Sequence, residues 1–287
     1  YAELNRRIRE EHITAWDKAG KWLKRQFMPG GLLPGEVFQQ KIKRDSEFEA
    51  IEFDIGHLVG AVERAIKADY KLPADKLDEK TQILLSSVMA GEIGEDVPEG
   101  TKVALLGMRK YIDGLTIEYL NVLDQQRAEL EAIGSAEANE RASLMGVIAG
   151  NVGRYVHRSY KAFDDADWAK KVPDNVLDNA REYLLTRLTE SGQAEPAKRV
   201  EVILNEILKH GTAYENMEAF IKESKLGAKD LSVLKKRQDI SPEIRALLGE
   251  YTDPRINFAK SATKMGRLIW NQKFLDRIRE IGMGSFL

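Results

Sequence analysis

The side chains most able to do chemistry gather in one stretch, residues 153–168, which we call the polar segment. His157 is followed there by Asp164, Asp165 and Asp167, and a histidine near clustered carboxylates could bind a metal ion or form an acid–base pair. Their spacing matches no metal-ligand pattern. Carboxylates before a helix commonly bind its free amides and oppose its dipole. We therefore predict no metal site here, and expect the aspartates to cap the next helix and form ion pairs.

The sequence contains no other catalytic signature. Ser159 lies in neither a Gly-x-Ser-x-Gly nor a Ser-x-x-Lys motif, and no phosphate-binding or dinucleotide-binding loop is present. Glu10-Glu11-His12 lacks the second histidine of a zinc-protease helix. His12 and His57 accompany apolar stripes, so we expect partly buried core histidines. We predict no catalytic residue and no cofactor, although a pocket built from scattered residues around His157 and Asp164–Asp167 would escape these motifs.

Basic residues are concentrated at the two ends of the chain, although the formal net charge is only −2. Residues 1–27 hold seven Lys and Arg against four Asp and Glu, and residues 225–280 hold thirteen against seven. Cations repeated along a helix could bind a phosphate backbone, whereas the alternative is a solvated face partly neutralised by carboxylates. The candidate nucleic-acid-binding residues are Lys229, Lys235, Lys236, Arg237, Arg255, Lys260, Lys264 and Arg267.

The composition is that of an ordinary folded protein, with 43% hydrophobic and 31% charged residues in 287 positions. The chain has no cysteine, which excludes disulfides and thiolate zinc sites. No apolar run approaches the roughly 18–20 residues that span a bilayer, so we predict no membrane-spanning segment. Because the chain begins at Tyr1 within helical sequence, we expect it to be a piece of a longer polypeptide.

Apolar residues recur three or four positions apart through most of the chain, which predicts amphipathic helices. Ser241-Pro242 and Asp253-Pro254 predict two of the helix starts. Strand patterns are scarce, so the expected fold is an all-α, irregular bundle of about ten helices, with at most a small β-ribbon near residues 154–160. The first helix, residues 2–27, carries a stripe of Leu4, Ile8, His12, Trp16, Ala19, Leu23 and Phe27.

Two further patterns predict local features of the N-terminal half. Pro34 opens a short helix, and Ser46 with Glu49 forms a capping box that predicts the start of a separate, longer helix. Gly107 and Gly114 lie seven residues apart on another predicted helix. Because each glycine costs roughly 1 kcal/mol relative to alanine, we expect a close helix approach there.

A boundary at the polar segment divides the chain into two helical regions, residues 1–150 and residues 151–287, with one continuous domain as the alternative. Aromatic residues favour burial, and arginines can pair with nearby carboxylates. We therefore expect the polar segment to act as a structural joint between the two regions. The residues of this predicted joint are Arg154, Tyr155, Arg158, Tyr160, Phe163, Asp164 and Trp168.

Three stretches resemble helical regions of the large polyvalent proteins of bacteriophages and prophages: Arg25–Pro34, Arg154–Asp165 and Ile240–Arg255. The resemblance implies a region of a long multidomain protein that is packaged in the capsid interior or tail of a virion. Such a protein is delivered to, or made in, the bacterial cytoplasm. The family fuses these regions to modules such as virion RNA polymerases. No catalytic motif of such a module occurs here, so the resemblance assigns no catalytic residue.

These observations lead to three hypotheses of function. The favoured one is a non-enzymatic helical scaffold of an internal or ejected virion protein, which supports genome delivery or anchors a fused enzymatic module. Its partners would be other virion proteins or neighbouring domains of the same polypeptide. The alternative is an accessory region that binds DNA or RNA beside a phage enzyme such as a virion RNA polymerase. The third is an enzyme with a pocket around His157 and Asp164–Asp167.

Overall fold

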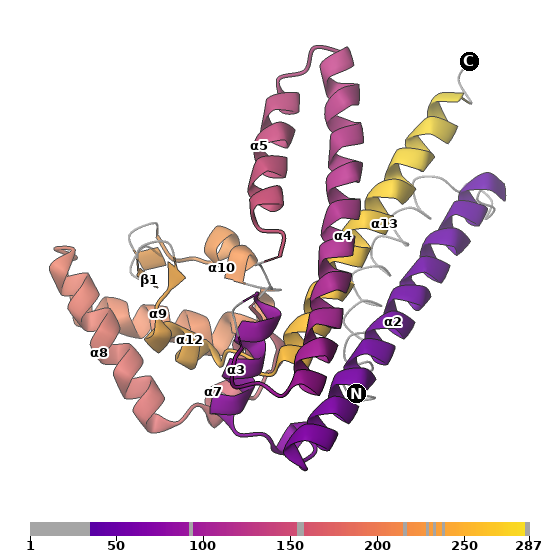
Figure 1. Ribbon diagram of the computed structural model, residues 1–287. Helices are drawn as coiled ribbons and strands as arrows, with labels where there is room; N and C mark the ends of the chain where they lie inside the picture. Colours follow the sequence, from indigo (N-terminus) through magenta and orange to yellow (C-terminus); the bar gives the residue numbers. More distant parts are fainter. Residues whose placement is uncertain are drawn as a thin grey trace. The chain divides into compact units, whose positions relative to one another are not determined.

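The computed structural model describes residues 35–91, 94–153, 158–214, 217–227, 230–231, 234–236 and 239–284. These residues are mostly helical, which confirms the predicted all-α, multi-helix fold (Figure 1). The α-helices are α2 (Gly35–Tyr70), α3 (Glu79–Met89), α4 (Glu99–Ala132), α5 (Glu137–Gly150), α6 (Lys161–Asp164), α7 (Trp168–Lys171), α8 (Asp174–Glu190), α9 (Pro196–His210), α10 (Met217–Glu223), α12 (Pro242–Leu248) and α13 (Pro254–Gly284). Two 3-10 turns are η1 (Ala74–Lys76) and η2 (Gly211–Ala213).

The β structure in the described part of the chain is very small. Strands β1 (Lys235–Lys236) and β2 (Asp239–Ile240) form one antiparallel ribbon, in register Lys235 to Ile240 and Lys236 to Asp239. Near the ribbon predicted at 154–160, Tyr160 forms a single antiparallel bridge with Glu250. Residues 154–157 lie outside the described residues.

The helices divide into two compact units. Unit 1 comprises residues 1–156 and 258–287, and unit 2 comprises residues 157–257. Most of the last helix belongs to unit 1, whereas the division predicted after residue 150 places it with the C-terminal region. The physical reason is the burial of α13 side chains, beginning with the fully buried Phe258, in the core of unit 1.

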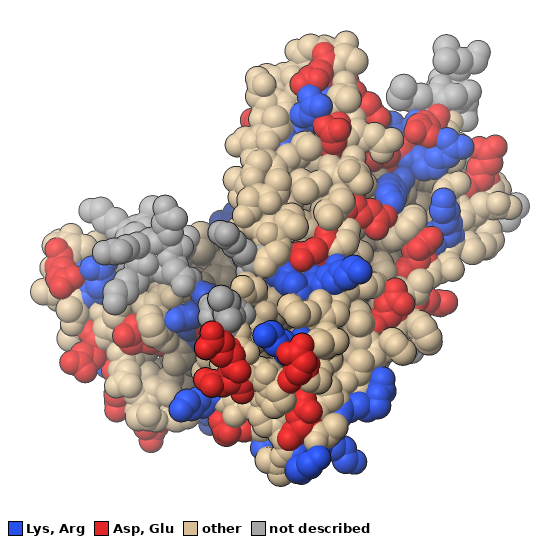
Figure 2. All heavy atoms as spheres, viewed as in Figure 1, with Lys and Arg blue, Asp and Glu red and all other residues tan. Residues whose placement is uncertain are grey.

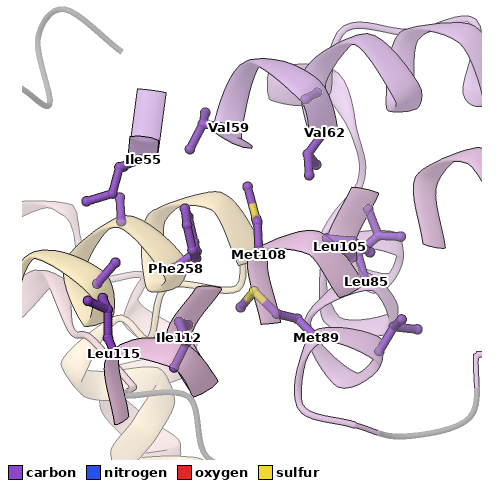
Figure 3. Close-up of a cluster of buried hydrophobic side chains, with 14 of the residues drawn as sticks. Ile55, Val59, Val62, Leu85, Met89, Leu105, Met108, Ile112, Leu115 and Phe258 are labelled. Carbon is purple, nitrogen blue, oxygen red and sulfur yellow. The ribbon is translucent and has the colours of Figure 1, made fainter. Parts of the chain in front are cut away.

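The core of unit 1 is formed by apolar stripes of long helices. α2 and α4 pack together, and α3 and α13 add to the same cluster. Each fully buried side chain of this size contributes roughly 1.5–3 kcal/mol relative to exposure. The core includes Ile55, Val59 and Val62 of α2, Leu85 and Met89 of α3, Leu105, Met108, Ile112 and Leu115 of α4, and Phe258 of α13 (Figure 3).

Helix α2 is continuous over its 36 residues, so the separate helix start predicted from Ser46 and Glu49 is wrong. Ser46 is an exposed residue inside the helix. One turn earlier, Lys41 Nζ lies 2.6 Å from Asp45 Oδ2, an i,i+4 ion pair that supports a continuous helix. A serine on an exposed helix face costs only a few tenths of a kcal/mol, and no proline or glycine lies nearby to stop the helix.

Helix α13 packs against both α2 and α4. A Cβ atom at Gly266 would lie 2.5 Å from Ile51 Cδ1 of α2, so a larger residue there would require the Ile51 side chain to shift. On the α4 side, Lys273 Nζ lies 2.5 Å from Glu118 Oε1. Gly266 thus lies at a tight contact between α13 and α2 among the described residues, and the sequence did not single it out.

The close helix approach predicted at Gly107 and Gly114 is not found among the described residues. A Cβ atom at Gly107 would make an ordinary 3.8 Å contact with Leu58 Cδ2. At Gly114 it would meet no atom of the described residues within 4 Å. Both glycines instead line a hollow between α2 and α4.

Unit 2 is built from shorter helices, of which α8, with 17 residues, is the longest described. Its packing includes the pairs α8–α9 and α8–α12. Ser241 Oγ accepts a hydrogen bond from Ile244 N at 3.3 Å, so the helix start predicted at Ser241-Pro242 is confirmed. The core includes Tyr160, Phe163, Ala180, Leu184, Leu188, Val200, Ile203, Ile207, Phe220, Ile244 and Leu247.

Some predictions concern residues outside the described part of the chain. These include the helix over residues 2–27, its histidine His12, and Pro34. Within the described residues, no helix combines the length and apolar character needed to cross a membrane.

Candidate functional site

The described part of the polar segment is held in unit 2 by backbone pairing with residues that follow α12. Tyr251 N donates to Ser159 O at 3.0 Å, and Lys161 N donates to Gly249 O at 3.0 Å. The bridge at Tyr160 lies between these two bonds. This pairing fixes the start of α6 against a region about ninety residues later in the chain.

Trp168 is anchored against the end of α12. Its indole Nε1 donates to Leu247 O at 2.9 Å, and Lys161 Nζ lies 5.0 Å from the ring centroid. The ring packs on Gly249, which ends α12 with a φ of +68°. A Cβ atom there would overlap the ring, coming within 2.7 Å of Trp168 Cε2. Both the backbone conformation and the space at this position therefore require glycine.

Glu250 contacts two arginines beside this backbone pairing. Its Oε1 lies 3.3 Å from Arg158 Nε, and its Oε2 lies 3.6 Å from Arg245 Nη1. The Arg158 side chain is 43% exposed, so solvent screens its pair, which contributes at most about 1 kcal/mol. The position of Glu250 follows from the backbone pairing rather than from this ion pair.

The aspartates of the polar segment contact backbone amides and lysines. Asp165 accepts a hydrogen bond from Asp167 N at 3.0 Å and one from Lys171 Nζ at 2.7 Å. Asp167 lies 2.7 Å from Lys170 Nζ, and this hydrogen bond and charge lower the pKa of Asp167. Asp167 immediately precedes α7, but its side chain makes no capping bond. The capping predicted for Asp167 is therefore wrong, because its carboxylate is turned toward Lys170 instead.

A chain of aromatic rings connects the polar segment to the core of unit 2. The rings of Tyr160 and Phe163 meet edge to face at 6.0 Å, Phe163 lies 6.1 Å from Phe220, and Phe220 lies 5.3 Å from Tyr214. Tyr214 Oη donates to Glu206 Oε1 at 2.5 Å. Burial, helped by the carboxylate of Glu206, raises the pKa of Tyr214 to about 12, so its hydroxyl stays protonated at neutral pH.

The predicted joint is described in part. Arg154 and Tyr155 lie outside the described residues, as does His157. Its other members all belong to unit 2: Arg158, Tyr160, Phe163, Asp164 and Trp168. The contacts given above place Tyr160, Phe163 and Trp168 in the packing of that unit. A role in joining the two helical regions stays a prediction.

Four of the candidate nucleic-acid-binding residues are Lys229, Lys235, Lys236 and Arg237, at or near β1 in the sequence. Lys229 and Arg237 lie outside the described residues, and the side chains of Lys235 and Lys236 are not described either. Arg255 is held by a carboxylate: its Nε lies 3.0 Å from Asp253 Oδ1 and its Nη2 lies 2.6 Å from Asp253 Oδ2. The Arg255 side chain is only 15% exposed, so it has a structural contact at the start of α13.

The remaining three candidates, Lys260, Lys264 and Arg267, lie on α13 in unit 1. Their spacing of four and three residues places them on one helix face. Each of them is partly buried. On the face of the molecule in Figure 2, basic and acidic side chains are interspersed over the described helices.

Two long-range polar contacts in unit 1 were missed by the sequence patterns. Asp69, near the end of α2, accepts hydrogen bonds from Thr101 N and Thr101 Oγ1, each at 2.7 Å, and so caps α4. Asp113 of α4 accepts one from Gly153 N at 2.9 Å and one from Arg109 Nε at 3.0 Å. Burial would raise the pKa of Asp113, but these hydrogen bonds and the Arg109 charge outweigh it and lower the pKa.

The sequence patterns also did not predict the hollow between α2 and α4. Its volume is about 620 Å³, and Trp270 of α13 forms part of its wall. Tyr111 Oη donates to Asp54 Oδ2 at 3.3 Å in this hollow. Burial and, to a smaller extent, the Asp54 charge raise the pKa of Tyr111. The seven-residue spacing of Gly107 and Gly114 was the signal that could have predicted a hollow on this face.

His57 is exposed on α2, so the prediction of a partly buried core histidine is wrong at this position. The buried stripe of α2 passes through Ile55 and Val59, and His57 lies two positions from each of them. Because successive residues are rotated by about 100° around the helix axis, the His57 side chain points away from this stripe. Within the described residues, no three His, Cys, Asp or Glu side chains gather closely enough to hold a metal ion.

Comparison with known proteins identifies no relative. No protein-family model matches the chain, and neither does a curated protein or a solved structure.

Proposed function

We propose that these residues form a non-enzymatic helical scaffold, the interaction region of a phage virion protein that is internal to the particle or ejected with the genome. In this role the region supports genome delivery or anchors a fused enzymatic module. Its partners are other virion proteins or neighbouring domains of the same polypeptide.

The non-enzymatic part of the proposal rests on one observation, the structural contacts that the acidic residues of the polar segment make. Asp165 binds a backbone amide and Lys171, and Asp167 pairs with Lys170. The pKa of Asp167 is lowered by Lys170, whereas a general acid at neutral pH needs a raised pKa. These groups therefore serve the local structure.

The virion part of the proposal is supported by the resemblance of three stretches, Arg25–Pro34, Arg154–Asp165 and Ile240–Arg255, to large polyvalent proteins of phages. The second of these includes the backbone pairing at Tyr160, and the third includes the Gly249 contact with Trp168. The residues that carry the resemblance thus include those that build unit 2.

Mass spectrometry of purified virions tests the location. Peptides of this region are expected in particles after nuclease treatment and removal of surface-bound material. If such peptides occur in the lysate of infected cells but not in purified particles, the virion assignment is wrong. Separation of tails from capsids would then distinguish a capsid-internal protein from a tail protein.

Binding of labelled DNA or RNA tests the alternative, a nucleic-acid-binding accessory region. Charge reversal of Lys235, Lys236 and Arg237 should abolish a salt-dependent shift if these residues bind phosphates. Under the scaffold proposal, we expect no shift even at low salt. The contact of Arg255 with Asp253 favours this second outcome, because a paired arginine must first give up its carboxylate.

A further inference from the structure

The side of α2 that faces away from the core of unit 1 carries exposed apolar residues. The buried stripe of α2 includes Ile51 and Ile55. On the opposite side, Phe38 and Ile42 are each 52% exposed and Phe53 is 74% exposed. At about 100° per residue, these three side chains project within about 60° of one another and roughly opposite to Ile51. A helix that is apolar on more than one side is commonly covered on each, so this second side indicates a further contact.

Ser46 and Glu49 complete this side of the helix. Both are exposed, and they lie between Ile42 and Phe53. The steps from Ile42 to Ser46, Glu49 and Phe53 are four, three and four residues, the alternation by which two long helices pack side by side. We call these four residues, together with Phe38, the outer face of α2. None of the five lines the hollow between α2 and α4.

The charges beside the outer face are divided along α2. Lys41 and Lys43 precede its middle, whereas Glu49 and Glu52 follow it. Lys41 Nζ lies 2.6 Å from Asp45 Oδ2 of the same helix, in a pair that is open to solvent on both sides. Among the described residues, Lys43, Glu49 and Glu52 have no ion-pair partner. The basic first half and the acidic second half are therefore available to a partner.

A second copy of α2, laid antiparallel, matches the outer face. With Ile42 of one copy beside Phe53 of the other, Ser46 lies beside Glu49 and can donate a hydrogen bond to its carboxylate. The same contacts repeat across a two-fold axis, because each residue meets the surface that its counterpart presents. The small side chain of Ser46 leaves room for the helices to approach at their middle.

This antiparallel register also brings opposite charges together. Each side of one helix meets the same side of the other, so Lys41 lies about 3 Å along the axis from Glu52 of the other copy. Lys43 lies about 4.5 Å along the axis from Glu49 of the other copy. A parallel pair would instead set Glu49 against Glu49 and Lys41 against Lys41. Charge complementarity therefore selects the antiparallel arrangement.

We propose that two copies of this protein associate through the outer face of α2, in a two-fold, antiparallel contact of the two helices. A single pair of helices in contact over about 30 Å buries less than the roughly 1,600 Å² of a standard interface. The dimer is accordingly weak, with a dissociation constant on the order of 100 µM. The contact involves unit 1 alone, and it does not depend on the virion location proposed above.

Sedimentation equilibrium of the full chain, from about 5 µM to about 500 µM, tests the association. We expect monomers at the lowest concentration and mostly dimers at the highest. Ile42→Glu places a carboxylate in the contact, opposite Phe53 and near Glu49 of the other copy, and should raise the dissociation constant at least about tenfold. The matched control is Ile117→Glu on α4, because Ile117 is also 52% exposed. It should leave the dissociation constant unchanged.

Exchange of charges tests the pairing of the two halves. Lys41→Glu with Lys43→Glu makes the outer face acidic throughout, and Glu49→Lys with Glu52→Lys makes it basic throughout. Each double variant alone should associate at least about tenfold more weakly than the unchanged protein. An equimolar mixture of the two should form a mixed dimer at least as tightly as the unchanged protein, because every charge contact is then between opposite signs.

A distance between spin labels tests the orientation. The chain has no cysteine, so Glu36→Cys at the exposed start of α2 provides a single labelling site. In the antiparallel dimer the two labels lie about 35 Å apart along the helix axis. A parallel dimer would place them less than about 20 Å apart, because the helix axes themselves lie about 10 Å apart.

Three results would overturn the proposal. One is a monomer at about 500 µM in the unchanged protein, which would leave the outer face to another part of the chain or to a different protein. Another is equal weakening by Ile42→Glu and Ile117→Glu. The third is a label separation below about 20 Å. Helical circular dichroism and an unchanged melting temperature in each variant establish that a loss of association is not a loss of folding.

Discussion

The two units use different means to hold helices together. Unit 1 contains helices of 36, 34 and 31 residues, and their apolar stripes form the core. The helices of unit 2 are shorter, and backbone pairing, a glycine cap and an aromatic cluster supplement its apolar core. Long helices gain many periodic contacts, whereas short ones depend more on the loops that orient them.

The polar contacts of the two units differ in the same way. In unit 1, Asp69 and Asp113 each bind a backbone amide of another element. In unit 2, the carboxylates of Asp165 and Glu250 lie within loops or at their edges. The comparison indicates that unit 1 should tolerate loop changes better than unit 2, and that each unit should respond mainly to damage in its own core.

The largest expected effect is on the core of unit 2. Phe220→Ala removes a fully buried ring and should lower the unfolding free energy by about 3–5 kcal/mol. Hydrogen exchange should accelerate in α8 and α9 but not in residues 51–66 of α2. Equal acceleration in both places would show that the two cores unfold as one, which contradicts the separation of the units.

Gly249, the glycine that ends α12, should be the next most sensitive position of unit 2. Gly249→Ala costs about 1–2 kcal/mol for the left-handed conformation and about 1–3 kcal/mol more for displacing the Trp168 ring. Gly192→Ala is the matched control, because Gly192 has the same φ of +68° but no described atom within 4 Å of its Cβ position. Denaturant unfolding should show a clearly larger loss for Gly249→Ala. Equal losses would mean that the ring contact contributes nothing.

Unit 1 should show a pH dependence that comes from Asp113. Its pKa is lower in the folded protein than the ordinary value of about 3.9, so its ionised form stabilises the fold above that pH. This contribution is lost as the pH falls below about 4 through the folded pKa. Asp113→Asn should cost about 1–2 kcal/mol at pH 7 and flatten the stability curve in the acid range. If Asp113→Asn and wild type lose stability in parallel from pH 5 to pH 2, the carboxylate is not responsible.

The smallest expected effect distinguishes a helix interior from a helix start. Ser46→Ala in α2 should leave the stability unchanged or raise it by a few tenths of a kcal/mol, because alanine favours helix interiors. Ser241→Ala removes a true N-cap of α12 and should cost about 1 kcal/mol. Thermal unfolding of the two variants gives the comparison. A loss of about 1 kcal/mol in Ser46→Ala would instead support the helix start predicted at Ser46.

Local patterns correctly predicted much of the fold. The three- and four-residue spacing of apolar residues correctly predicted amphipathic helices, and Ser241-Pro242 identified the start of α12. The same reasoning failed at Ser46, because a capping box and an exposed turn of helix interior can share one sequence. It also failed at His57, where proximity along the chain was mistaken for proximity on the helix face.

The candidate site was predicted less well than the fold. The aromatic residues of the polar segment were correctly expected to be buried at Tyr160 and Phe163. Their partners could not be predicted, because Trp168 meets Leu247 and Gly249 about eighty residues away. No periodicity links two positions that far apart, so only packing brings them together.

The amino-acid sequence by itself determined that this protein is all-α, that its helices are amphipathic, and where some of them begin. These properties depend on backbone conformation and side-chain spacing within a few turns of helix. Tertiary structure decided that most of α13 belongs to unit 1, that Asp69 caps α4, and that a hollow opens between α2 and α4. Each of these depends on the fit of surfaces distant in sequence, which only the packed chain brings into contact.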